Sequence, residues 1–158
     1  MIMKKVKYFK CYFDGACEPK NPGGALGIGY CINEFNGSDY VAPDVDNSNN
    51  VAEYLAFRKV IDSLQDKRGC KIEIFGDSML VIMQMTGKWK IKNGMYKDIA
   101  LRTLPLFKQL QQLNDVTLKW IPRELNSRAD KQSVLSIENT VKTYTVFETK
   151  KKLMTTNN

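Results

Sequence analysis

The chain has 158 residues, of which 43% are hydrophobic and 26% charged, a composition typical of a globular domain rather than a disordered chain. Lys and Arg outnumber Asp and Glu by 24 to 17, and the net charge of +7 favours a polyanion as partner, although a solvated basic surface gives the same count. The absence of His and of any C-x-x-C pair excludes a zinc finger, a Ser-His-Asp triad and a Cys-His nucleophile. No apolar run reaches the ~18 residues of a membrane span. No apolar segment follows the basic residues 1–10, as a secretory signal requires, so we expect a cytoplasmic protein with reduced thiols.

The first half of the chain predicts an antiparallel meander followed by a helix. Alternating or aromatic-rich runs predict the strands Tyr8–Phe13, Ala25–Phe35 and Tyr40–Val45. A turn at Asn36-Gly37 joins the last two of these. The polar residues Asp46–Asn50 supply caps for a helix over Val51–Leu64, where apolar residues recur with helical periodicity.

The second half predicts two more strands, each followed by helices. The predicted strands are Lys71–Phe75 and Val116–Ile121. The predicted helices are Met79–Met85, a segment from Gly94 to Leu113 that Pro105 kinks or splits, and Asn126–Glu138. This order of elements describes a mixed sheet flanked by helices, an α/β domain over residues 1–138. Residues 139–158 form a basic C-terminal extension, for which we expect one added strand over Thr140–Phe147 and then a frayed tail.

Two acids stand where strands end. Asp14 follows the first strand directly before a glycine, and Asp77 follows the fourth strand between Gly76 and Ser78. Ligands gather at the carboxyl ends of strands in open α/β sheets, so both positions suit a site. A plainer interpretation makes Asp77 the N-cap of the next helix and Asp14 a turn residue.

Two further acids begin the buried faces of helices. Phe57, Val60 and Leu64 share the helical stripe of Glu53, and Val134 and Ile137 lie below Asp130 in the same way. A carboxylate in the first helical turn gains only ~0.3–1 kcal/mol from the helix dipole. Burying an unpaired carboxylate costs several kcal/mol, so the dipole does not explain acids that point inward. A bound cation does.

The four acids together predict a metal site made of oxygen ligands alone. Such a ligand set selects hard cations, with Mg²⁺ first and Mn²⁺ as a substitute. Two ions ~3.5–4 Å apart can stabilise the attacking and the leaving oxygen of an in-line displacement. The reaction class that follows is phosphodiester hydrolysis.

Four sequence blocks resemble type 1 ribonuclease H, in the family's order and spacing over roughly residues 8–138. The blocks are Asp14-Gly15-Ala16-Cys17 with Asn21-Pro22-Gly23-Gly24, Asn49-Asn50-x-x-Glu53, Gly76-Asp77-Ser78, and Asn126-x-x-x-Asp130. The resemblance implies a five-stranded sheet in the order 3-2-1-4-5 and cleavage of the RNA strand of RNA–DNA hybrids. It maps the catalytic, metal-binding acids onto Asp14, Glu53, Asp77 and Asp130. The Gly-Lys-Trp-Lys and Pro-Arg-Glu-x-Asn runs are similar to the archaeal and plant-like branch, which lacks the long basic handle helix.

The chain departs from the family pattern at two positions. Many members carry a His in the loop before the fourth carboxylate, where this chain has Arg123 and Glu124. An Arg stays protonated and can bind a phosphate bidentately, so we predict that Arg123 acts on the scissile or product phosphate as a fixed positive charge. The alternative is an ion-paired or solvated loop residue. The second departure is Met79, which replaces a polar side chain that often follows the Asp-Ser pair.

The substrate contacts are predicted in two regions of the chain. An enzyme specific for a hybrid must detect the 2′-OH, and Asn offers both a donor and an acceptor for it. The resemblance assigns this contact to Asn49 and Asn50 and to the surroundings of Gly15, Cys17, Asn21 and Asn126, while the alternative is a capping loop. Lys88, Trp89 and Lys90 interleave cations with an aromatic ring, which suits phosphate contacts, unless Trp89 packs into the core.

We therefore expect a monomeric endoribonuclease that uses two Mg²⁺ ions and leaves 3′-OH and 5′-phosphate ends. Its expected partner is the RNA–DNA hybrid, with double-stranded RNA as a second substrate to be tested, and no membrane. Two alternatives stay open: a non-catalytic nucleic-acid-binding module, or another metal nuclease of the same fold, such as a junction or transposition enzyme.

Overall fold

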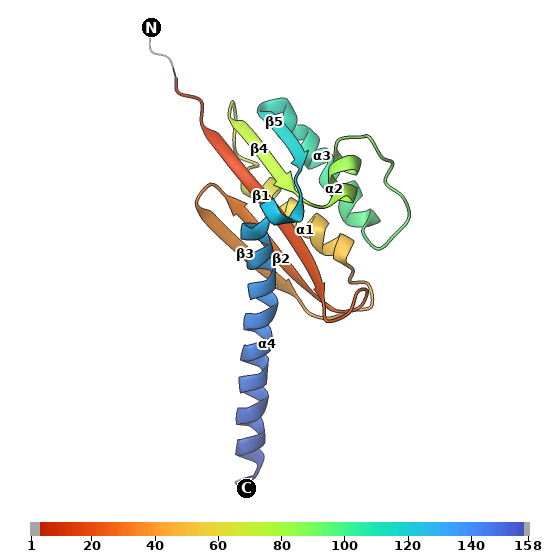
Figure 1. Ribbon diagram of the computed structural model, residues 1–158, viewed down its shortest axis with the longest axis vertical. Helices are drawn as coiled ribbons and strands as arrows, with labels where there is room; N and C mark the ends of the chain where they lie inside the picture. The colour runs from red at the N-terminus through yellow and green to blue at the C-terminus, as the bar shows by residue number, and fades with distance from the viewer. Residues whose placement is uncertain (1–3, 157–158) are drawn as a thin grey trace.

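A five-stranded mixed sheet forms the centre of the computed structural model, which describes residues 4–156 and their side chains except at 141–148 and 155–156 (Figure 1). Its strands are β1 (Tyr8–Glu18), β2 (Ala25–Ile32), β3 (Phe35–Val41), β4 (Lys71–Gly76) and β5 (Asp115–Trp120). They lie in the order β3-β2-β1-β4-β5, as the resemblance implied. β1 is antiparallel to β2 and parallel to β4, so the antiparallel and the parallel parts of the sheet meet at β1.

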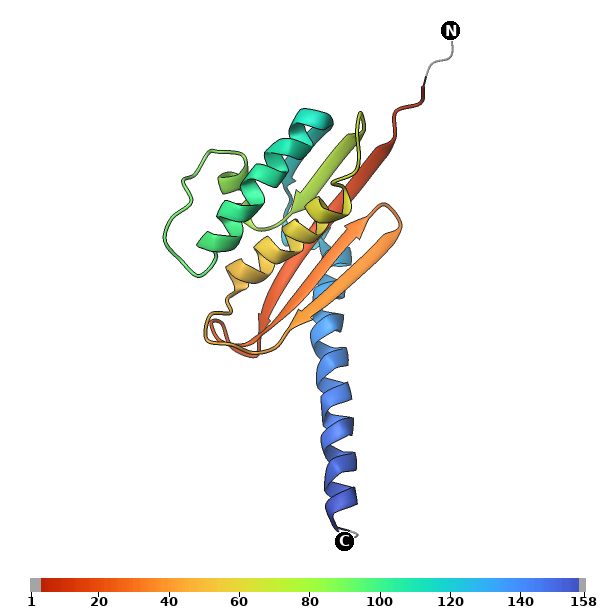
Figure 2. The same ribbon diagram turned by 180° about the vertical axis from the view of Figure 1, so that it is seen from behind.

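Helices cover both faces of this sheet. They are α1 (Asn49–Ser63), α2 (Met79–Met85), α3 (Lys97–Leu113) and α4 (Ser127–Thr156), with a short 3₁₀ turn, η1, at Arg123–Leu125. The two views show α1 and α3 on one face of the sheet and α4 on the other (Figures 1 and 2). Within residues 4–156, none of these helices is long and apolar enough to cross a membrane.

The main hydrophobic core lies between the sheet and α1. Phe57 of α1 is fully buried between Phe13 and Phe107, with ring centroids 5.3 and 5.4 Å away. Val60 and Leu64 are buried on the same stripe, which confirms that the inward face of this helix begins at Glu53. This core holds β1 and α1 in fixed positions relative to each other. The polar side chains that these two elements carry next to the core are therefore also held in place.

α4 packs directly on the backbone of β2. A Cβ atom at Gly29 would overlap the backbone carbonyl of Ala129, so only glycine allows the helix to lie this close. The prediction of a buried stripe through Val134 is wrong, because Val134 is exposed and the inner face carries small residues such as Ala129 and Ser133. Small side chains suit a helix that touches a strand at van der Waals distance.

The predicted strand over Thr140–Phe147 is also wrong. α4 continues as one helix through this segment to Thr156 and projects beyond the sheet (Figure 1). The β-branched and aromatic residues of the segment favour a strand, but the helix is already nucleated by the turns packed on β2, and each added residue then extends it at little cost.

Other details of the strands and helices also differ from the prediction. β1 runs on through Glu18 because its pairing with β2 continues to Glu18↔Ala25. β3 lies earlier, at Phe35–Val41 instead of Tyr40–Val45, and β2 ends at Ile32 instead of Phe35. The predicted turn at Asn36-Gly37 is therefore wrong, because these two residues pair with β2 inside β3. α3 is a single helix with Pro105 inside it. The carbonyl that loses its helical partner is that of Leu101, which is exposed, so it can bond to water instead.

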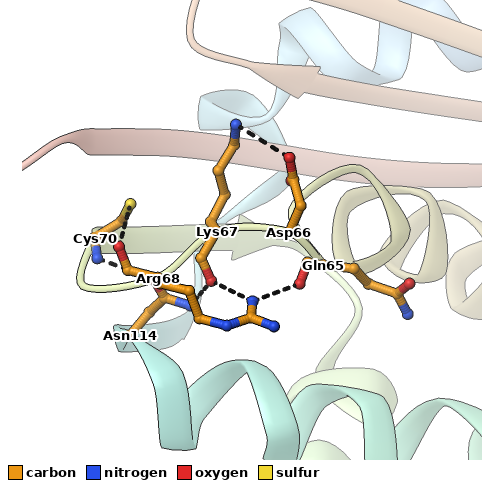
Figure 3. A network of polar contacts seen from close by, with 6 residues as sticks. All are labelled: Gln65, Asp66, Lys67, Arg68, Cys70 and Asn114. Carbon is orange, nitrogen blue, oxygen red and sulfur yellow. Dashed lines mark hydrogen bonds and ion pairs between the residues drawn. The ribbon is translucent and has the colours of Figure 1, made fainter.

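A network of polar contacts closes the end of the sheet where β4 and β5 begin (Figure 3). The buried Asn114 side chain accepts a hydrogen bond from the Cys70 backbone at 2.9 Å. It donates to the carbonyls of Lys67 and Leu110. Arg68 donates to the carbonyls of Gln65 and Lys67. The network lies at the end of the two strands opposite to Gly76, where β4 stops.

Candidate metal centre and nucleic-acid interface

The strand register places Asp14 beside Asp77. Phe13 of β1 pairs with Gly76, the last residue of β4, so the next residue of each chain segment lies at the same edge. The sequence predicted that Asp14 follows the end of the first strand. Asp14 instead lies inside β1, at the point where the neighbouring strand β4 stops. Ser78, not Asp77, caps α2, since its side chain accepts from the Val81 backbone. The capping alternative for Asp77 is thus wrong.

The close contact between β1 and α1 adds Glu53 to this pair. A Cβ atom at Gly15 would overlap the backbone of Ala52, so the glycine after Asp14 is what lets α1 touch the strand. Glu53, one residue further along the helix, is almost fully buried and accepts a hydrogen bond from the Gly15 backbone. The start of α1 is capped by Ser48, whose side chain accepts from Val51.

Asp130 approaches from the other face of the sheet, in the first turn of α4. The buried Asn126, directly before that helix, donates from its side-chain amide to the carbonyl of Phe13 at 2.9 Å. This bond ties the start of α4 to the residue that precedes Asp14. Asn126, predicted as a substrate contact, therefore has a structural partner inside the protein.

Three of the acids lie close together. One carboxylate oxygen from each of Asp14, Glu53 and Asp77 lies within 4.8 Å of the other two. Burial, then the charge of Asp77 and contact with Asp130, raise the pKa of Asp14 to about 8. Burial and the charge of Asp14 raise the pKa of Glu53 well above its usual range. Both shifts express the same fact, that several carboxylates are held where their negative charge is poorly solvated.

This arrangement fits a divalent cation. The buried Oε2 atom of Glu53 has no hydrogen-bond partner within the described part of the chain. An unpaired buried carboxylate oxygen is costly, and a cation bound between the three acids would satisfy it. The donors are all carboxylate oxygens, the ligands that Mg²⁺ and Mn²⁺ favour.

The acids line a cleft of about 410 Å³, which we call the acidic cleft. Its lining comes from β1, α1, the segment after β4, η1 and α4: Asp14, Gly15, Ala16, Glu18, Asn49, Asn50, Glu53, Asp77, Ser78, Met79, Leu80, Arg123 and Asp130. The Arg123 side chain is 78% exposed and its guanidinium lies 3.7 Å from the Asp130 carboxylate. The structure therefore brings Arg123 to the rim of the cleft, next to the fourth acid.

A second cleft, of about 480 Å³, adjoins the first and shares Leu80 with it. We call it the basic cleft, and its lining is Leu80, Gln84, Lys88, Trp89, Lys90, Lys92 and Tyr96. Trp89 is 46% exposed, so the alternative that this ring packs into the core is wrong. Cations and an accessible aromatic ring thus stand beside the acids, which is the combination that binds nucleic-acid backbones and bases.

The remaining predicted contacts are divided between the cleft and the interior. Asn49 and Asn50 line the acidic cleft, and the Asn49 backbone donates to the Asn21 side chain at 2.9 Å. Asn21 therefore joins the loop after β1 to the start of α1. Cys17 is buried, and its thiol donates to the Lys20 carbonyl at 3.2 Å, so the structure does not bring its side chain into the cleft.

Sequence reasoning missed Glu18 and the buried pair Gln84 and Tyr96. Glu18 lines the acidic cleft because residues two apart on a strand share a face, and Asp14, Ala16 and Glu18 follow this alternation along β1. A prediction that extended the first strand to Glu18 would have placed Glu18 on the same face as Asp14. Gln84 and Tyr96 carry no local signal, since they meet only when α2 and α3 pack together.

Comparisons with known proteins agree with this geometry. The family model for RNase H matches residues 6–138. The Bifunctional protein Rv2228c of Mycobacterium tuberculosis is 31% identical over 84 residues, 53% of this chain and 22% of that protein. The Ribonuclease HI of Halobacterium salinarum is 34% identical over 123 residues, 75% of this chain and 59% of that protein. This chain thus spans about a fifth of one relative and three fifths of the other.

Among solved structures, LC11-RNase H1 in complex with an RNA/DNA hybrid matches with a TM-score of 0.73 and 26% sequence identity. The match covers 84% of this chain and 99% of that one. The match therefore includes nearly all of LC11-RNase H1 and most of this chain.

Proposed function

The chain belongs to the ribonuclease H family, and on that premise we propose that it hydrolyses the RNA strand of RNA–DNA hybrids. The observation that carries the proposal is the cluster of Asp14, Glu53 and Asp77, with Asp130 beside it, at the floor of a cleft next to a basic one. A related protein, LC11-RNase H1, was solved with an RNA/DNA hybrid bound.

The carboxylate lining of the acidic cleft supports two Mg²⁺ ions as the cofactor, with Mn²⁺ as a substitute. Asp14, Glu53 and Asp77 would hold one ion, and Asp14 and Asp130 the other. When bound, the ions would stabilise charge on the phosphate oxygens and lower the pKa of a water, which loses its proton more readily and can then attack phosphorus. The attack breaks the bond to the 3′-oxygen, and the products carry 3′-OH and 5′-phosphate ends.

The protein prepares this site by holding acids that resist ionisation on their own. Because the pKa of Asp14 is about 8 and that of Glu53 is raised, cation binding near neutral pH must displace protons from the cluster. Affinity for the cation therefore increases with pH over this range.

Arg123 supplies a fixed positive charge at the rim. Its guanidinium stands 3.7 Å from Asp130 and is largely exposed, so it can reach a phosphate without leaving the neighbourhood of the acid. It cannot exchange protons at working pH, which separates its action from that of a histidine in the same loop.

The two clefts together read the duplex. Asn49 and Asn50 border the acidic cleft, where an amide can recognise a 2′-OH on the cleaved strand. Lys88, Lys90 and Trp89 border the basic cleft, where they contact the backbone without reading its sequence. The whole site lies within one chain, and we expect the enzyme to act as a monomer.

We also assign the catalytic domain to residues 1–138, with residues 139–158 as an extension. The family match over residues 6–138 and the packing of the first turns of α4 on β2 support this division.

One assay tests the proposal. A hybrid of defined sequence, labelled in turn on each strand, is incubated with the protein in Mg²⁺, in Mn²⁺ and with chelator. We expect cuts in the RNA strand only, with either ion and not with chelator, and 5′-phosphate ends on the new fragments. Cleavage that persists in chelator, or cuts in the DNA strand, would overturn the proposal.

A further inference from the structure

We infer that the buried amide of Gln84 is a positioning residue that holds the basic cleft in the shape that binds the hybrid; the inference rests on the function proposed above. The basic cleft is formed largely by the α2–α3 loop, residues 86–96, which has no regular secondary structure. Such a loop needs contacts from elsewhere to present Lys88, Trp89 and Lys90 in a defined arrangement.

The two ends of the loop are held by backbone contacts. The backbones of Lys88 and Trp89 both donate to the Met83 carbonyl, at 2.9 and 3.0 Å. At the other end, the Lys97 backbone donates to Gly94 at 3.1 Å. Between these ends, Ile91 packs against the main core.

Gln84 connects the middle of the loop to the protein interior. It is 3% exposed, and its Nε2 group donates to the Lys90 carbonyl and to the Tyr96 hydroxyl, both at 3.2 Å. Its Oε1 atom accepts from the Tyr54 hydroxyl at 2.5 Å. Both amide hydrogens and the amide oxygen are thus used, which fixes the orientation of the group.

The partners of Gln84 are themselves rigid. Tyr54 and Tyr96 stack with ring centroids 5.8 Å apart and planes within 8°. Tyr54 is fully buried and directly follows Glu53 on α1, so the same helix that carries a metal-binding acid also anchors the loop. The network therefore sets the basic cleft in place relative to the acidic cleft.

The expected consequence is a preorganised binding surface. A loop that is already ordered loses less conformational freedom when the duplex binds, so its affinity is higher than that of the same lysines on a mobile loop. The effect falls on binding and not on the chemical step, because Gln84 lines the basic cleft and is not among the residues that line the acidic cleft.

The test replaces Gln84 with an apolar side chain of similar length, Gln84→Met. We expect the KM for a defined hybrid to rise about tenfold while kcat stays within about twofold, the pattern of lost ground-state binding. We also expect faster amide hydrogen exchange in residues 86–96 of the free protein. Tyr54→Phe removes one bond of the network and should act in the same direction more weakly, which keeps the test available if Gln84→Met folds poorly.

Asn114→Leu is the matched control. Asn114 is also a buried amide with three hydrogen bonds, but it lies at the opposite end of β4 and β5 (Figure 3). It should lower the melting temperature and speed exchange near residues 67–70, without changing KM or the exchange of residues 86–96.

Two results would overturn the inference. One is a Gln84→Met protein with normal KM, and the other is normal exchange in residues 86–96. The proposed function is tested separately by the wild-type protein: if it leaves the hybrid intact, the function fails, while the exchange comparison still decides whether Gln84 orders the loop.

Discussion

The clustered acids lower the stability of the fold when no metal is bound. Asp14 and Glu53 are both about 5% exposed, and the nearest titratable groups are other acids. Like charges at this distance repel, and low solvation strengthens the repulsion. The free energy of unfolding without metal should therefore rise when one of these charges is removed.

Asp77→Asn tests this repulsion. We expect cleavage to fall by at least about 10³-fold and the metal-free melting temperature to rise by about 3 °C, which corresponds to about 1 kcal/mol in a domain of this size. The measurement is a thermal melt in chelator beside a hybrid-cleavage assay. Asp115→Asn, which removes an exposed acid at the start of β5, is the control and should change neither. A clearly lower melting temperature for Asp77→Asn would refute the repulsion argument.

The raised pKa of Asp14 predicts the pH dependence of metal-free stability. The group keeps its proton in the folded protein up to about pH 8 but loses it near its ordinary value of 3.8 when unfolded. Over that interval the folded state binds more protons, so the free energy of unfolding falls as pH rises. The chain has no His that would titrate in the same range.

We therefore expect the melting temperature in chelator to decrease steadily from pH 5 to pH 8. The slope should become smaller in Asp14→Asn and in wild type with saturating Mg²⁺. A melting temperature that increases over this range would show that Asp14 is ionised in the free protein.

Arg123 provides the third prediction. Arg123→Ala should lower kcat by about tenfold, and Arg123→Lys should recover part of the loss, because Lys keeps the charge but not the planar fork. The pH–rate profile of the wild type should lack a break near ~6.5, where an imidazole titrates. The control is that Mg²⁺ still raises the melting temperature of Arg123→Ala, which shows that the variant retains the metal site. Wild-type kcat in Arg123→Ala would remove Arg123 from the site.

At the scale of elements, packing decides where the sequence patterns were insufficient. The stripe of Phe57, Val60 and Leu64 correctly predicted which way Glu53 faces, because burial of a whole helix face leaves a periodic signal. The stripe predicted below Asp130 is correct for Ile137, which is half-buried against Gly27, and wrong for Val134, which is exposed. The rest of the contact between α4 and β2 is made by small residues that leave no periodic signal. The extent of β1 and the helical course of residues 140–147 depend on β2 pairing and on helix propagation, which a local pattern does not contain.

The α2–α3 loop carries the fourth prediction. Changing Lys88, Lys90 and Lys92 together to Gln should raise KM and reduce the salt slope of hybrid binding, by up to ~0.9 per lost phosphate contact. The control changes Lys4, Lys5 and Lys7, which are equally exposed but belong to the segment before β1. An unchanged salt slope in the loop variant, or an equal change in the control, would show that the three loop lysines are solvated and do not contact the hybrid.

At the scale of the whole molecule, distant parts of the chain converge on one edge of the sheet. The four acids come from β1, α1, the segment after β4 and α4, and the parallel pairing of β1 with β4 supplies the shared edge. Sequence blocks predicted the acids and the strand order because their types and spacing follow the family pattern. They did not predict the Gln84 network, which exists only once α1, α2 and α3 are packed together.

The most direct test of the central claim is the initial rate of cleavage on three duplexes of one sequence. An RNA–DNA hybrid, a duplex RNA and a duplex DNA are compared in Mg²⁺, for wild type and for Glu53→Gln purified in parallel. We expect the wild type to cleave the RNA strand of the hybrid, to leave the duplex DNA intact, and to lose hybrid cleavage in Glu53→Gln. An intact hybrid with the wild type, or equal rates for the two proteins, would contradict the account of this acidic cleft as the catalytic metal centre.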